Sequence, residues 1–218
     1  VENSWEHAKL ANIQLILMVS MVMKPLILAA LLSISFHNLA TAQSCTVQLH
    51  ILGVGQDAGA PQIGNNKDVA WQDRSERLLA TALALTDHRF DKRYLFEATP
   101  DIREQLYALD QITPPATGSL GINGVFLTHA HIGHYAGLMF FGHESAGTEN
   151  IPVFAMPRMK SFLEENGPWS QLVNYHNITL QALGNHKLQA LESYLSVTPL
   201  QVPHRDEYSE TVAFIIKG

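Results

Sequence analysis

The chain has 218 residues, of which 46% are hydrophobic, which is enough for one domain with a sizeable core and too few for two. Its formal net charge is −6 and no cluster of lysine and arginine offsets it locally, which excludes the basic surface that nucleic-acid binding requires. Cys45 is the only cysteine, so an internal disulfide and a cysteine-based zinc site are both excluded.

The N-terminal segment has the composition of a targeting sequence. A Met-Lys pair at residues 23–24 is followed by an apolar run over 25–36 and by Ala-Thr-Ala at 40–42, the small-x-small pattern that signal peptidase accepts. We therefore expect a signal peptide over 23–42, with residues 1–22 an upstream extension or alternative start, and a periplasmic or secreted mature protein. Because residues 13–23 are apolar too, an uncleaved membrane anchor is the alternative, and membrane contact is expected through this segment alone.

The rest of the chain alternates between strand-like and helix-like patterns. Strands are expected over residues 46–54, 93–97, 124–128, 151–155, 195–202 and 211–216. Helices are expected over 100–109, 135–141 and 159–165, while 75–86 fits either a helix or a strand of the first sheet. A glycine-rich loop over 53–61 has no Lys-Ser/Thr after it and so does not indicate a phosphate-binding P-loop. Together these elements predict a layered α/β or α+β sandwich.

Three histidines follow the predicted strand 124–128 within six positions, namely His129, His131 and His134. The first two, at i and i+2, project to the same side while the backbone stays extended, and the third arrives as the chain turns toward a helix. Imidazole nitrogens are good zinc ligands at neutral pH, and three protein ligands with one open water position define a catalytic site. We therefore favour a metal site over loop histidines that only hydrogen-bond to their surroundings.

The segment 126–138 resembles the H-x-H-x-D-H signature of the metallo-β-lactamase superfamily. His129 and His131 match the first two ligands of one metal site, and His134 matches the histidine of a second site. His204, further along the chain, matches the downstream metal-binding histidine. The resemblance implies an αββα sandwich with the metal at one edge of two packed sheets.

Gly133 stands where the superfamily has its aspartate. Since glycine can neither ligate a metal nor act as a base, we expect one zinc site and doubt a second. The superfamily's later aspartate and final histidine have no counterpart before Lys217-Gly218. We therefore expect the metallo-β-lactamase-like domain, residues 43–218, to be incomplete at its C-terminus.

Segments 52–62, 97–103 and 202–211 resemble the pyrroloquinoline-quinone biosynthesis protein B family. That family usually has cysteines after its Pro-Gln, where this chain has Ile-Gly-Asn-Asn at 63–66, and typically lacks the first two histidines of the signature, which this chain keeps. These departures indicate a hydrolase-like relative and not a faithful cofactor-biosynthesis protein.

Four acidic residues are further candidates for the site. Asp57 is a candidate general base, the alternative being the zinc-bound hydroxide itself. By family analogy, Glu97 would hold a ligand histidine through its second ring nitrogen. Asp206, with the adjacent Glu207, would orient His204 or contact substrate, and a solvated acidic turn is the equal alternative.

These features predict an exported zinc-dependent hydrolase, in which a zinc-bound hydroxide attacks an ester, an amide or lactam, or a phosphodiester of a small-molecule substrate. One alternative is a non-catalytic metal-binding relative that kept the fold. Another is an iron enzyme of pyrroloquinoline-quinone biosynthesis, although three histidines without a carboxylate fit zinc better than a two-histidine, one-carboxylate iron site. The fold does not specify the substrate, and the sequence does not predict the oligomeric state.

Overall fold

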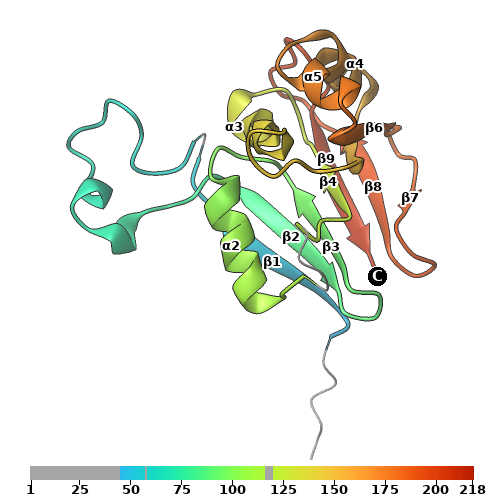
Figure 1. The fold of residues 1–218 in the computed structure, drawn as a ribbon, viewed down its shortest axis with the longest axis horizontal. Helices are drawn as coiled ribbons and strands as arrows, with labels where there is room; N and C mark the ends of the chain where they lie inside the picture. The colour runs from blue at the N-terminus through green and yellow to red at the C-terminus, as the bar shows by residue number, and fades with distance from the viewer. Residues whose placement is uncertain (1–44, 57, 116–119) are drawn as a thin grey trace, which may run out of the picture. The chain divides into compact units, whose positions relative to one another are not determined.

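The computed structural model describes residues 45–56, 58–115 and 120–218, so the predicted signal peptide and the extension before it lie outside the described residues. The strands form two sheets (Figure 1). The larger sheet has its strands in chain order, namely β1 (Val47–Gly53), β2 (Ala82–Asp87), β3 (Lys92–Phe96), β4 (Gly124–Phe126), β5 (Ile151–Ala155) and β6 (Ile178–Ala182). The smaller sheet consists of β7 (Gln189–Ala190), β8 (Ser196–Gln201) and β9 (Val212–Lys217).

The larger sheet is mixed in direction. Strands β1, β2 and β3 pair antiparallel, with Leu49 opposite Leu85, whereas β3 to β6 run parallel, with Leu95 opposite Val125. The carboxyl ends of parallel strands meet at one edge of a sheet, where α/β proteins place their ligand sites. The loops after β3, β4 and β5 therefore gather at the edge that receives the predicted histidines.

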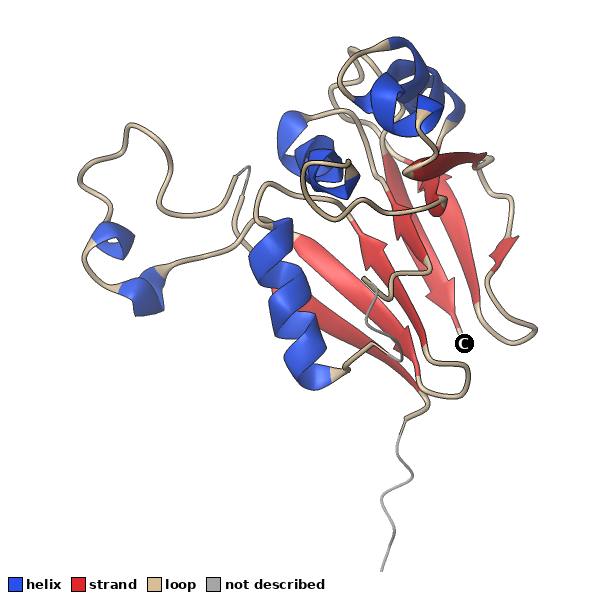
Figure 2. Cartoon of the chain, in the orientation of Figure 1, coloured by secondary structure: helices blue, strands red, loops and turns tan. Residues whose placement is uncertain are grey.

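Helices cover one face of the larger sheet (Figure 2). They are α2 (Ile102–Ile112), α3 (Ile132–Tyr135), α4 (Pro157–Glu165), α5 (Trp169–Asn174) and the 3-10 helix η3 (Ala136–Phe141). In α2, the buried residues Ile102, Leu106 and Leu109 follow the helical period and face the sheet. Two more 3-10 helices, η1 (Val69–Trp71) and η2 (Arg74–Glu76), lie in a segment that extends away from the sheets (Figure 1).

A second core lies between the two sheets. At its centre the ring of Phe126 stacks on Phe154 with centroids 4.4 Å apart and meets Phe214 of β9 edge-on at 5.6 Å. Val125, the neighbour of Phe126, packs into the first core instead. Strand β4 is thus buried on both faces, which explains its uninterrupted apolar sequence.

The predicted mixed α/β fold is confirmed, and the described residues form one helical and two β layers of the expected αββα sandwich. The ambiguous segment 75–86 ends as strand β2, because it pairs with both β1 and β3. The predicted helix over 135–141 is split between α3 and η3, and α5, β6 and β7 were not predicted. Within the described ranges, no helix is long and apolar enough to cross a membrane.

Candidate metal centre

Strand β4 leads directly into the histidine cluster. Backbone hydrogen bonds from Leu127 to β5 and from β9 to Thr128 keep the chain extended past the end of β4. His129 comes next, and a hydrogen bond of 2.9 Å from the His134 amide to the His131 carbonyl marks the start of α3. The strand-to-helix turn predicted from the sequence is therefore present, with two histidines before the helix and one inside it.

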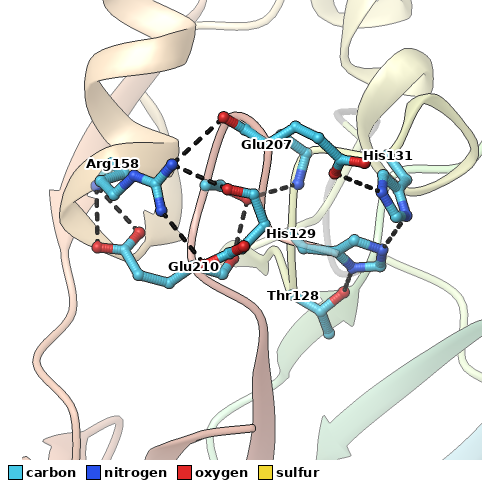
Figure 3. Close-up of polar contacts among 9 residues, drawn as sticks. Thr128, His129, His131, Arg158, Glu207 and Glu210 are labelled. Carbon is cyan, nitrogen blue, oxygen red and sulfur yellow. Dashed lines mark hydrogen bonds and ion pairs between the residues drawn. The ribbon is translucent and has the colours of Figure 1, made fainter. Parts of the chain in front are cut away.

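Three imidazoles converge at this turn. One ring nitrogen of each of His129, His131 and His204 lies within 4.8 Å of the corresponding nitrogens of the other two. Nε2 of His129 is 2.8 Å from Nδ1 of His131 (Figure 3). The ring centroid of His204, in the loop between β8 and β9, lies 4.9 Å from that of His129 and 5.0 Å from that of His131. Two loops far apart in sequence thus present metal-ligating groups to one point.

The ring of His129 is held in one orientation. Oγ1 of Thr128 lies 2.7 Å from Nδ1, which leaves Nε2 turned toward His131. Burial lowers the pKa of His129 to about 3, and the neighbouring imidazoles act in the same direction. The ring is therefore neutral at pH 7, and its nitrogen lone pair is available to a metal.

An acidic turn meets the cluster through Glu207. Its Oε2 lies 3.4 Å from Nε2 of His131, on the opposite side of the ring from His129 (Figure 3). A carboxylate in this position orients a metal-binding imidazole and raises its basicity. The structure places Asp206 elsewhere, with its carboxylate 3.7 Å from Nη1 of Arg158.

Glu97 and His134 form a pair beside the cluster. Oε1 of Glu97 lies 3.6 Å from Nδ1 of His134 and accepts a hydrogen bond of 3.3 Å from the Thr128 amide. Burial raises the pKa of Glu97, and the contacts with His134 and Thr128 oppose this shift. The ring centroid of His134 lies 4.3 Å from that of His129, so the pair borders the three converging rings.

A sequence model of the β-lactamase superfamily domain matches residues 92–218, more than half of the chain. The chain belongs to the metallo-β-lactamase superfamily. No curated protein sequence matches it.

Solved structures of the superfamily share the fold. Zn²⁺-bound PqqB from Methylobacterium extorquens matches with a TM-score of 0.63 and 23% identity, covering 77% of this chain and 58% of that one. A diphosphatase of the PhnP family matches with a TM-score of 0.56 and 23% identity, covering 78% and 61%. The short form of human tRNase Z matches with a TM-score of 0.50 and 15% identity, covering 77% and 64%. The chain spans less than two thirds of each structure, and these similarities establish the fold alone.

Two other residues from the sequence analysis, Gly133 and Asp57, and the loop after β3 complete the description of the site. Gly133, in the aspartate position, is buried in α3, and Asp57 lies outside the described residues. Asp101, in the loop after β3, accepts a hydrogen bond of 2.8 Å from the Ala80 amide and so holds the glycine-rich loop and its partner segment in place. Gly53 allows that close packing, since a Cβ there would lie 2.0 Å from the Ala80 carbonyl oxygen.

Three residues around the centre were missed by sequence reasoning. Thr128 stands directly before His129, a signal that could have been used. Ser209, in the His204 loop, contacts Ala130, and Arg158, in α4, contacts the His204 loop. Both contacts join distant parts of the chain, so no local pattern marks them. Their contacts show that both loops are tied down by residues outside the signature.

Proposed function

We propose that this chain is a zinc-dependent hydrolase that cleaves an ester, an amide or lactam, or a phosphodiester of a small molecule. The observation that carries the proposal is the convergence of His129, His131 and His204, whose ring nitrogens lie within 4.8 Å of one another. Three nitrogen donors match a catalytic zinc site, which keeps one position open, better than a closed structural site. When bound there, zinc lowers the pKa of a bound water to about 7 and polarises the bond to be cleaved.

The chain's own residues prepare this centre. Thr128 holds the ring of His129 from one side, and Glu207 holds the ring of His131 from its outer nitrogen. Rings fixed in this way lose little further rotational freedom when a metal binds. Neutral His129 also needs no deprotonation at pH 7 before it ligates.

One zinc per chain is the expected stoichiometry. Gly133 brings no carboxylate to the second site, so His134 would have to bind a second ion with Glu97 or other neighbours. The general base is either Asp57 or the activated water itself, because Gly133 supplies none. The phosphodiester class, already expected from the sequence, has further support because two proteins of similar fold are a diphosphatase and a tRNase.

The test measures zinc content and hydrolysis in the same samples. We would compare the wild type with His131→Ala and His204→Ala, using His88→Ala, an exposed histidine in the turn after β2, as the matched control. After dialysis against a weak chelator, the wild type and the control should keep about one zinc, and both site variants should lose it equally. A panel of ester, lactam and phosphodiester substrates should show turnover of one class that both site variants abolish.

Two results would contradict the proposal. Normal zinc in His204→Ala would remove His204 from the centre. Zinc binding without hydrolysis of any class in the panel would make the chain a metal-binding relative without this activity.

We also propose that the protein is exported. The support is the Met-Lys start at 23–24, the apolar run 25–36 and Ala-Thr-Ala at 40–42. N-terminal sequencing of the protein from the host's extracytoplasmic fraction should begin just after Ala42. Material that retains residues 23–42 would instead indicate an anchor.

A further inference from the structure

The loop between β8 and β9 carries His204, and burial of apolar side chains contributes little to holding it in place. Pro203 and the five residues after it are exposed, so apolar packing does not fix the position of His204. The base of the loop is closed by a hydrogen bond of 3.0 Å from the Val202 amide to the Thr211 carbonyl. Besides a ring contact between Tyr208 and Phe162 of α4, with centroids 5.5 Å apart, polar contacts hold the exposed part near His129 and His131.

Arg158, in the first turn of α4, supplies several of these contacts (Figure 3). Its Nη2 donates to the carbonyl of Asp206 at 2.9 Å and to that of Glu207 at 3.3 Å. Its backbone amide donates to the two carboxylate oxygens of Glu210 at 3.0 and 3.3 Å. One residue therefore holds three positions of the loop.

The geometry of α4 explains why this contact is made. Met156, at the N-cap, makes no side-chain cap hydrogen bond, and the first turn contains no acidic residue. The carboxylate of Glu210 provides both the missing acceptor and a negative charge next to the positive end of the helix dipole. The ion pair between Arg158 and Asp206 is exposed and contributes little by itself, so the bonds to the backbone carbonyls matter more.

Ser209 ties the same loop to the histidine cluster. Its buried Oγ accepts a hydrogen bond of 2.8 Å from the Ala130 amide and donates to the Glu210 carbonyl at 2.8 Å. Ala130 lies between His129 and His131 in the sequence. The loop is thus held against the cluster at Ser209 and against α4 at Arg158.

We propose that Arg158 is a positioning residue for the metal centre, fixing the loop so that His204 stays within reach of His129 and His131. The inference rests on the proposed zinc site. Removing the Arg158 guanidinium breaks its bonds to the Asp206 and Glu207 carbonyls and leaves the backbone bonds to Glu210 in place. The exposed loop would then sample positions in which His204 is out of reach, and the apparent metal affinity falls by the fraction of time spent there. Arg158→Ala should weaken zinc binding by roughly 10-fold, the lower end of the loss seen when residues bonded to a metal ligand are removed, because Arg158 acts on the loop and not on an imidazole.

The experiment compares Arg158→Ala and Arg158→Lys with wild type, using Lys160→Ala as the matched control. Lys160 lies on the same helix and pairs with Glu164 within it, so its loss removes a positive charge without touching the loop. Zinc affinity is measured by chelator competition on the full chain, and the visible absorption spectrum of the Co²⁺-loaded protein reports the ligand set. Unfolding by urea without metal measures the purely structural contribution.

We expect Lys160→Ala to bind zinc as the wild type does. Arg158→Ala should bind more weakly, with a Co²⁺ spectrum shifted toward that of His204→Ala. Arg158→Lys should fall between wild type and Arg158→Ala, since an ammonium keeps the charge but not the planar fork that reaches two carbonyls. This variant also keeps the test decisive if Arg158→Ala does not fold.

Three outcomes would overturn the inference. If the Arg158 variants keep the zinc affinity and the Co²⁺ spectrum of the wild type, Arg158 has only a structural role, whatever the stability of the variants. An equal loss in Lys160→Ala would point to general electrostatics. If His204→Ala itself binds zinc normally, both the proposed zinc site and the positioning role of Arg158 are wrong. If zinc is lost in the histidine variants but not in the Arg158 variants, the zinc site stands and only the role of Arg158 is wrong.

Discussion

Replacing Phe126 with alanine should remove a large part of the free energy of unfolding. Its ring is fully buried, with centroid distances of 4.4 Å to Phe154, 5.1 Å to Phe96, 5.6 Å to Phe214 and 6.4 Å to Tyr94. Truncating a buried phenylalanine typically costs about 3–5 kcal/mol, and aromatic pairs add about 0.5–1.5 kcal/mol each beyond buried area. With four rings around it, we expect a loss near the top of that range, about 5 kcal/mol.

Urea unfolding of the metal-free protein measures this loss. Since a domain's whole stability is about 5–15 kcal/mol, Phe126→Leu, with an expected loss of about 1–2 kcal/mol, provides a variant that stays folded. The control is Phe90→Ala, because Phe90 is 52% exposed and, among the described residues, its ring stacks on Tyr194 alone, so its loss should stay below about 1 kcal/mol. Because β4 continues into His129, Phe126→Ala should also lower the affinity for zinc. A cost for Phe126→Ala no larger than that for Phe90→Ala would refute this account of the second core.

Three further changes test other parts of the structure. Gly137→Ala would place a Cβ 2.1 Å from the Thr99 carbonyl oxygen, so its urea midpoint should fall by an amount corresponding to about 3 kcal/mol, and an unchanged midpoint would contradict the packing. Burial raises the pKa of Tyr94 to about 12, against about 10 unfolded, so its stabilisation is complete below pH 10 and lost as pH rises toward 12. Between pH 9 and 11, the free energy of unfolding of Tyr94→Phe, measured by urea titration, should therefore fall less than that of the wild type. An equal fall in both proteins would be evidence against a raised pKa of Tyr94. Gly133→Asp should raise zinc content from one to two per chain beside His134, and a single zinc would show that this carboxylate does not complete the second site.

The strands that were predicted correctly are those whose own sequences have the apolar pattern of a buried strand. The apolar run of β4 predicts a strand buried on both faces, and Phe126 and Val125 indeed enter different cores. Strand β7, by contrast, has two residues and depends on its pairing with β8, and α5 has six residues, too few to show a helical period. These elements are determined by tertiary contacts and leave no pattern to detect.

The candidate site divides in the same way. The clustering of His129 and His131 is local and could be predicted from spacing, whereas His204 could be assigned only through a family resemblance. Glu207 rather than Asp206 lies against His131, a choice between adjacent residues that depends on how the loop is held. Arg158 could not be predicted, because its contact with the loop arises from the packing of α4.

Glu97 shows how the fold imposes a local conformation at this centre. Its φ of 80° lies in the left-handed region, which costs about 1–3 kcal/mol for a residue other than glycine and persists only where the surroundings require it. Those surroundings are specific: the Glu97 amide donates to the Phe126 carbonyl at 2.9 Å, and the Ala98 amide donates to the His134 carbonyl at 2.9 Å. The end of β3 is thereby bonded to β4 before the histidines and to α3 after them. The unusual backbone at Glu97 lets one residue make its strand contact while its carboxylate reaches Thr128 and His134, so the loop that presents the histidines is held from both ends.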